Sequence, residues 1–228
     1  MMTTNKLTKT FASGSLAIGV LAGAVLAATS ASATTPSPNG SVTSTWAAWV
    51  AGNPLVIPGN GATATYVVDS TFVPSQPGFD TVTLFKAGDE YEFTYSAIPG
   101  TLATDSNAGT LIYDITFPTF VNGVSIDSDT TETYGSVTKQ GEPEFSRTLT
   151  SFNGDPDPFP NGFLDIPLTK ALRITDTFIP TNPGSTNEGL SVLSNNFREA
   201  PHVPEPGTIL GLLAVGGLGL VSRFKKQK

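Results

Sequence analysis

Side chains able to perform nucleophilic or metal chemistry are scarce in this chain of 228 residues. It has one histidine, His202, and no cysteine. The missing thiols exclude cysteine nucleophiles, zinc–thiolate sites and disulfides. A triad of serine, histidine and an acid would have to use His202, which lies two residues before a Pro-Glu-Pro triplet. A linker position of this kind cannot hold an imidazole rigidly, so we predict no catalytic histidine.

Carboxylates are the only plentiful reactive groups, and two of them have a spacing that could serve catalysis. Glu90 and Glu92 alternate with aromatic residues, so both would lie on one face of a strand, roughly 6.5–7 Å apart. Inverting glycosidases use two carboxyl groups about 6.5–9.5 Å apart. Alternating acids are also the ordinary pattern of a solvated strand face, and we favour that interpretation. We therefore predict no catalytic residue and no enzyme.

Two acidic stretches are candidates for calcium binding. One contains Asp127 and Asp129, and the other contains Asp155 and Asp157 in a long loop. Calcium takes about six to eight oxygen ligands, which such loops often supply. Neither stretch follows the EF-hand pattern, and Asp also occurs in turns because it bonds its own backbone. We therefore predict no cofactor and keep calcium as the candidate ion.

Trp46 and Trp49 lie three residues apart in a segment, 42–50, that is predicted to be a strand. On a strand the two indoles would face opposite ways, so at most one would be in the core. The other would either cover the core from an edge strand or lie exposed, where it could stack on a sugar ring.

Hydrophobic and polar residues alternate with a period of two through most of the chain, which predicts strands that bury one face. Turn clusters rich in glycine and proline separate them, and Asn122-Gly123 is a hairpin signal. Only Leu190 to Phe197 could form one helical turn. The predicted fold is all-β, an antiparallel, jelly-roll-like β-sandwich. The candidate strands are 42–50, 63–69, 81–86, 90–96, 111–117, 120–126, 130–138, 145–150 and 171–179.

The C-terminal stretch is of a different kind. Pro204, Glu205 and Pro206 precede the uncharged segment 208–222, and the last residues, 223–228, are mostly basic. A helix over 208–222 would be roughly 23 Å long, against a hydrocarbon core of roughly 30 Å, and snorkelling cations would close part of the gap. The basic end is typical of a cytoplasmic tail. Four glycines in this segment would make a poor helix in a soluble core.

This arrangement resembles the PEP-CTERM sorting signal of exported proteins in Gram-negative bacteria and cyanobacteria. The resemblance covers about the last 26 residues. It implies that exosortase, a membrane peptidase-transferase, recognises Pro204, Glu205 and Pro206, and that the following segment and tail are removed. Two prolines keep the backbone extended and unpaired, which suits access by such an enzyme.

The N-terminus also carries an export signal. Lys6 and Lys9 precede an apolar stretch, 16–28, which is followed by the small residues Ala31 and Ala33. This pattern predicts a secretory signal peptide that signal peptidase cleaves after Ala33. The predicted organisation is signal peptide 1–33, linker 34–41, β-sandwich 42–200, Pro-Glu-Pro linker 201–207, transmembrane segment 208–222 and cytoplasmic tail 223–228.

The segment between the two signals is strongly acidic. Residues 34–203 keep six of the 12 cations and 18 of the 19 acids, which gives a formal net charge of −12. We therefore predict no nucleic-acid partner, because little would neutralise phosphates. The prediction is an exported protein, anchored in the membrane before processing and then found at the cell surface, in the outer envelope or outside the cell. Its role would be structural or adhesive. The alternatives are a carbohydrate-binding module associated with exopolysaccharide and a carboxylate-dependent glycosidase.

Overall fold

The alternation of apolar and polar residues along the sequence places apolar side chains on the inward face of each strand and polar side chains on the outward face. In β5 (Glu90–Ser96), the side chains of Tyr91, Phe93 and Tyr95 are fully buried, whereas Glu90 and Glu92 point to the other face. Burying such aromatic faces supplies most of the free energy that offsets the ordering of the chain. The predicted period of two is thus confirmed at its strongest stretch.

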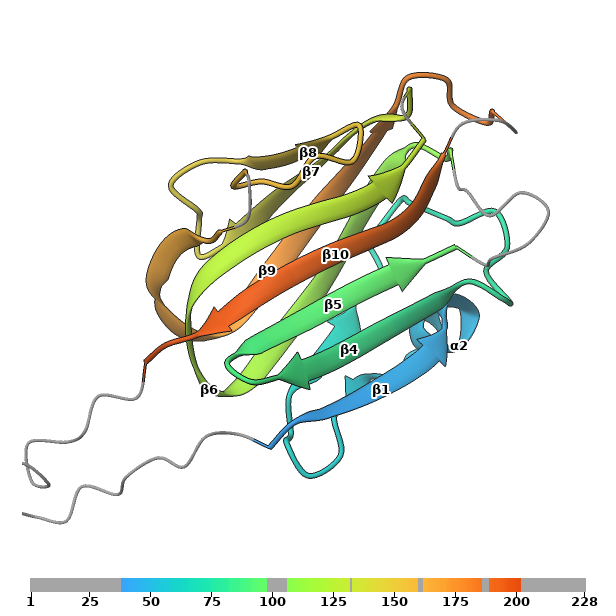
Figure 1. Cartoon of the computed structure of the whole chain (residues 1–228). Coiled ribbons are helices and arrows are strands. Elements are labelled where there is room, and N and C mark those ends of the chain that lie inside the picture. Colours follow the sequence, from blue (N-terminus) through green and yellow to red (C-terminus); the bar gives the residue numbers. More distant parts are fainter. Residues whose placement is uncertain (1–37, 98–105, 132, 160–161, 186–188, 202–228) are drawn as a thin grey trace, which may run out of the picture. The chain divides into compact units, whose positions relative to one another are not determined.

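The computed structural model describes residues 38–97, 106–131, 133–159, 162–185 and 189–201 (Figure 1). The predicted signal peptide, the Pro-Glu-Pro motif and the predicted transmembrane segment lie outside these residues. Within the described part, no helix is long and apolar enough to cross a membrane. The remaining elements are β1 (Gly40–Thr45), α2 (Trp46–Val50), β2 (Leu55–Val56), β3 (Thr63–Tyr66), β4 (Thr81–Ala87), β6 (Gly109–Thr130), β7 (Gly135–Glu142), β8 (Leu149–Phe152), β9 (Leu164–Pro180) and β10 (Leu190–Glu199).

All strand pairs are antiparallel and belong to one hydrogen-bonded sheet. Its order is β1-β4-β5-β10-β6-β9-β7-β8, and β3 joins β2 to β6 at the side of this path. The fold is therefore all-β, as predicted.

The long strand β6 divides this sheet into two layers. Its first part, 109–116, pairs with β3 and with residues 171–178 of β9. Its second part, 121–130, pairs with β10 and, over 121–124, also with the start of β9. A register shift separates the two parts, and Figure 1 shows the strand passing from the layer behind to the layer in front. We call the layer with β1, β4, β5 and β10 the front layer, and the layer with β3, β9, β7 and β8 the back layer.

Aromatic rings fill the space between the layers. Phe93 of β5 stacks on Tyr113 of β6 with 4.2 Å between ring centroids, and Phe117 lies 5.3 Å from Phe197 of β10. The first pair joins the front layer to the first part of β6, and the second joins it to the residue that directly follows that part, so the two layers face each other across one core. This arrangement is consistent with the predicted β-sandwich. The jelly-roll-like strand order stays a prediction.

The two tryptophans correct one prediction. Residues 46–50 form the short helix α2 instead of a continuation of the first strand, and Thr45 caps it by accepting a hydrogen bond from the Ala48 N–H. A spacing of three places both indoles on the same face of a helix. Trp46 and Trp49 are therefore both buried, at 2% and 0% exposure.

Two further predictions are wrong for identifiable reasons. Asn122-Gly123 is no hairpin, because β6 runs straight through it. A Cβ at Gly123 would lie 2.9 Å from the Phe163 side chain and 3.1 Å from Arg198, so glycine allows a close approach there. The segment from Leu190 is the strand β10, not a helical turn.

We expect Trp49→Ala to lower the free energy of unfolding by about 3–5 kcal/mol, because it leaves a large cavity and removes the bond from the indole N–H to the Ala64 carbonyl. Urea denaturation of the chain measures this change. Phe79→Ala is the matched control, because Phe79 is 67% exposed and its loss should change the value by less than about 0.5 kcal/mol. Equal effects of the two substitutions would contradict the assigned core.

Candidate functional site

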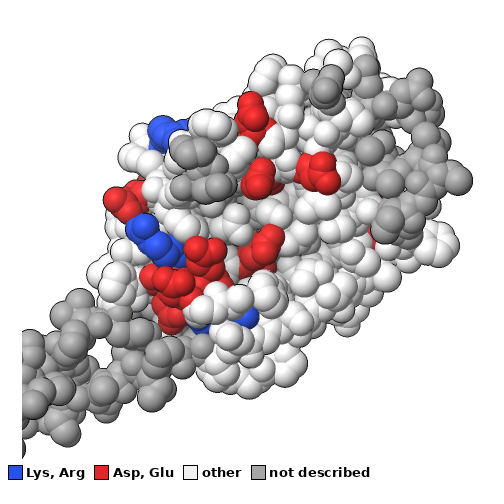
Figure 2. Space-filling model, viewed as in Figure 1, with Lys and Arg blue, Asp and Glu red and all other residues white. Residues whose placement is uncertain are grey.

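The outer face of the front layer gathers polar and acidic side chains. Along β10, Asn196 is paired with Glu92 of β5 on one side and with Ser125 of β6 on the other. Directly paired residues share a face of the sheet, so these three side chains lie in one row. Asp127 lies in the next row, opposite Ser194. Figure 2 shows acidic side chains spread over this face of the molecule.

The loop that follows β8 forms a wall beside this face. The backbone of Asp157 exchanges hydrogen bonds of 3.0 and 2.9 Å with Ile126 of β6. Arg147 holds the Asp157 carboxylate with two bonds of 2.7 and 2.5 Å, which lower the pKa of that carboxyl. Because Asp157 is paired with the inward residue Ile126, its neighbours Pro156 and Pro158 take the outward direction of Ser125 and Asp127.

Floor and wall together enclose a cavity of about 360 Å³, which we call the acidic groove. Its floor residues are Glu90, Ser125, Asp127 and Asn196, and its wall residues include Pro156, Pro158 and Phe163. A second concavity of about 450 Å³ contains Glu142 and Arg147. The ring that lines this second concavity, Phe145, is buried, so it offers a ligand little aromatic surface.

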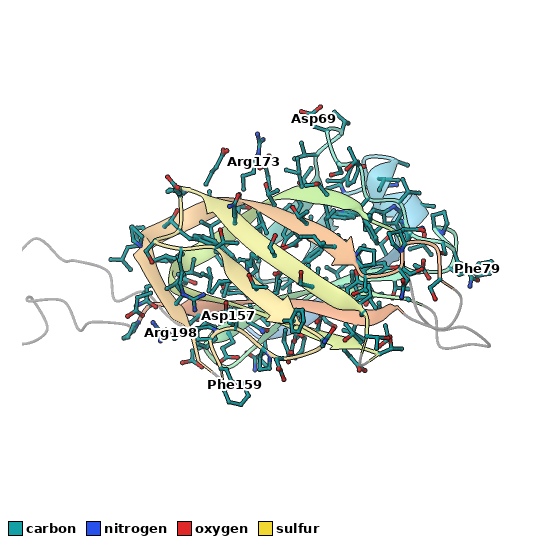
Figure 3. All side chains as sticks on the ribbon, turned by 90° about the horizontal axis from the view of Figure 1, so that it is seen from above. Asp69, Phe79, Asp157, Phe159, Arg173 and Arg198 are labelled. Atoms are coloured by element: carbon teal, nitrogen blue, oxygen red, sulfur yellow. The ribbon has the colours of Figure 1, made fainter. Side chains whose placement is uncertain are left out.

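Arg198 fixes the position of the Phe163 ring. Its guanidinium carbon lies 5.2 Å from the ring centroid, and the same group donates hydrogen bonds to Asn122 and Asp165. Phe159, 74% exposed, projects from the loop after β8, and Figure 3 shows it on the same side of the molecule as Asp157 and Arg198. The Phe163 ring thus flanks the polar floor on the loop side.

The polar floor of the acidic groove is available to a ligand. The side chains of Glu90, Ser125 and Asn196 make no hydrogen bond with any other residue that the structure describes. Burial, followed by the charges of Asp129 and Glu92, raises the pKa of the Asp127 carboxyl. Hydroxyl, amide and carboxylate groups beside apolar ring surface are the lining that orients a small polyhydroxylated ligand.

The structure buries some of the candidate site residues predicted from the sequence and places others at the groove. Trp46 and Trp49 are buried, so neither can stack on a sugar, and that prediction is corrected. Asp127 lines the groove, and Asp129 follows two residues later on β6. Sequence analysis missed Phe163 and Asn196, because a phenylalanine in a loop and an asparagine in an unrecognised strand carry no distinctive signal.

The four calcium candidates do not come together as a metal site. Asp155 and Asp157 lie in the loop after β8, and the Asp157 carboxylate already accepts hydrogen bonds from Arg147 and from the Thr150 N–H. Across the described ranges, no group of three or more His, Cys, Asp or Glu residues is arranged to hold a metal ion.

Comparison with known proteins adds one finding at the C-terminus. Residues 202–226 match the model of the PEP-CTERM protein-sorting motif, as the Pro204-Glu205-Pro206 pattern predicted. The match begins directly after the part of the chain that the structure describes. No curated protein matches this chain.

We expect the Asp127 pKa, measured by NMR titration, to lie above its ordinary value of 3.8. The folded state then binds the proton more tightly than the unfolded state, so the free energy of unfolding falls as pH rises through this pKa. Asp129→Asn should lower the Asp127 pKa only in part, because burial is the larger cause of the shift. A pKa at or below the ordinary value would contradict the geometry of the groove floor.

Proposed function

We propose that the folded domain is a non-catalytic structural or adhesive component of the cell surface or extracellular matrix. The observation that carries this proposal is the sorting motif at 202–226, which implies an exported protein that exosortase, a membrane enzyme, processes. The domain itself offers a large aromatic core and a strongly acidic surface. These properties suit a protein that must stay folded and soluble outside the cell without disulfides.

The proposed route has three steps. Signal peptidase cleaves after Ala33, segment 208–222 holds the exported chain at the membrane, and exosortase acts at Pro204, Glu205 and Pro206. The fold is compatible with this route, because β10 is the last strand within residues 38–201 and the Ala200 N–H, directly after it, still donates to the Phe120 carbonyl.

We propose carbohydrate binding in the acidic groove as a second candidate function. The supporting observation is the combination of the Glu90, Ser125 and Asn196 side chains, which bond no other described residue, with the Phe163 ring and two prolines. Carboxylates and the Asn196 amide would bond sugar hydroxyls, and the ring would cover an apolar sugar face. Glu90, Glu92, Asp127 and Asp129 give this face a negative charge, so it would favour neutral or amino sugars and repel uronates.

We expect Pro204→Ala combined with Glu205→Ala to leave the unprocessed chain in the membrane of a host that contains exosortase. The substitution removes the residues that the motif assigns to recognition and leaves the folded domain unchanged. Immunoblotting of membrane and extracellular fractions measures the outcome. Pro201→Ala, outside the matched motif, is the control and should be processed normally. Normal processing of the double variant would contradict this part of the proposal.

We expect the chain to bind a glucosamine or glucose oligosaccharide more strongly than a uronate oligosaccharide in calorimetric titration. Phe163→Ala and Asn196→Ala should each weaken binding about tenfold, equal to about 1.4 kcal/mol. Phe79→Ala is the control, since this exposed ring lies far from the groove (Figure 3). Binding that survives both groove substitutions would exclude the groove, and release of sugar fragments would favour a glycosidase instead.

A further inference from the structure

A cluster of polar side chains lies in the aromatic core between the two layers. Lys139 of β7, Asp176 of β9 and Asn195 of β10 are each 0% exposed. Lys139 and Asp176 are directly paired on neighbouring strands of the back layer. Asn195 reaches them from the front layer, and its Nδ2 donates a 2.7 Å hydrogen bond to Asp176 Oδ2.

Several polar atoms of this cluster lack hydrogen bonds although they are fully buried. Asp176 Oδ1, Asn195 Oδ1 and the Tyr113 hydroxyl are buried without a hydrogen-bond partner among the described residues. Lys139 makes no ion pair with Asp176. Its Nζ donates to the Ser125 carbonyl at 3.0 Å and lies 4.2 Å from the centroid of the Phe197 ring. Buried polar atoms are normally paired, so this exception requires an explanation.

The placement brings an amine close to a carboxamide. Phe197 and Asn195 are two residues apart on β10, and both side chains point into the core. Lys139 Nζ therefore lies beside the inward face of β10 where Asn195 is located. Asp176 is linked to both residues, because it is paired with Lys139 across the strands and its Oδ2 accepts the hydrogen bond from Asn195 Nδ2.

The environment favours the uncharged forms of both titratable groups. Burial lowers the pKa of the Lys139 ammonium to about 7. Burial likewise raises the pKa of the Asp176 carboxyl to about 7. An uncharged amine is a nucleophile, and an uncharged carboxylic acid can donate a proton.

We propose that Lys139 and Asn195 join through an isopeptide bond inside the core, with Asp176 as the proton relay. The Lys139 Nζ lone pair attacks Asn195 Cγ, which forms the Nζ–Cγ bond. Asp176 accepts a proton from Nζ and donates one to Nδ2, so that the Cγ–Nδ2 bond breaks and ammonia leaves. Asp176 ends in the protonation state in which it began, and the step needs no oxidant, reductant or other reactant.

Each unpaired atom has a role in this step. Asp176 Oδ2 is bonded to the nitrogen that leaves, and Asp176 Oδ1 is free to receive the amine proton. Negative charge develops on Asn195 Oδ1 in the tetrahedral intermediate. The Tyr113 hydroxyl, buried in the same cluster and influenced by the charge of Asp176, is the donor that would stabilise it.

The bond would connect β7 of the back layer to β10 of the front layer. It would close a loop in a chain that has no cysteine and cannot form a disulfide. The bond would form whether or not the chain is sorted or binds carbohydrate. The second buried lysine, Lys86, is different, because it forms a 2.7 Å ion pair with Glu199.

Tryptic peptide mapping of the full chain under denaturing conditions tests the proposal. The bond makes Lys139 resistant to trypsin, so the expected product is peptide 87–147 joined to peptide 174–198. Its mass should equal the sum of the two peptides minus one ammonia. Free peptide 174–198 with an intact Asn195, together with cleavage after Lys139, would overturn the proposal. This result needs no variant, so it does not depend on whether a substituted chain folds.

Variants then assign the roles. Lys139→Arg keeps the positive charge and Asn195→Ala removes the carboxamide, and both should abolish the joined peptide. Asp176→Asn should abolish it or slow its formation at least tenfold, and Tyr113→Phe should slow it without preventing it. Lys86→Arg is the matched control and should leave the joined peptide unchanged. A joined peptide in Asp176→Asn, formed at the original rate, would remove Asp176 from the mechanism.

Discussion

Membership of β6 in both layers is the constraint on which the rest of this structure depends. Its first part pairs with residues 171–178 of β9 and its second part pairs with β10, so these parts of the two strands are held face to face across the core. The contact between Asp176 and Asn195 and the stacking of Phe93 on Tyr113 both follow from that arrangement. The outer face depends on it as well, because the second part of β6 contributes Ser125 and Asp127 to the acidic groove.

The interior and the outer surface make different demands on stability. Each buried atom that lacks a partner costs about 1–3 kcal/mol, and a well-packed apolar substitute for a buried charged group is often at least as stable. Stability alone therefore does not account for Lys139, Asp176 and Asn195 in an otherwise aromatic core. A covalent bond would account for these residues, because its formation consumes the amine and the amide and connects the two layers. On the surface, the Glu90 and Asn196 side chains keep access to solvent without a hydrogen bond to another described residue, so they cost little and are free to serve binding.

Sequence alone predicted the strands whose inward positions are uniformly apolar, such as 90–96, and it predicted the sorting motif, whose residues are contiguous. The sequence-based prediction failed where a single residue departs from the apolar–polar pattern because it has a role other than core packing. Asn195 interrupts the apolar face of β10, and a register shift after Leu190 moves the alternation, so the remaining apolar residues were spaced like a helical turn. Gly123 indicated a hairpin because its real role, space for Phe163 and Arg198, depends on residues far away in the chain. The groove and the core cluster could not be predicted, because each is assembled from several strands.

An NMR spectrum of the folded chain, labelled with ¹⁵N at lysine Nζ, shows whether the core cluster reacts. The isopeptide bond converts one amine nitrogen into a secondary amide. We expect a single amide-type Nζ–H signal, which shows contacts to Asn195 and disappears in Lys139→Arg. A spectrum in which every lysine Nζ remains an amine would contradict it.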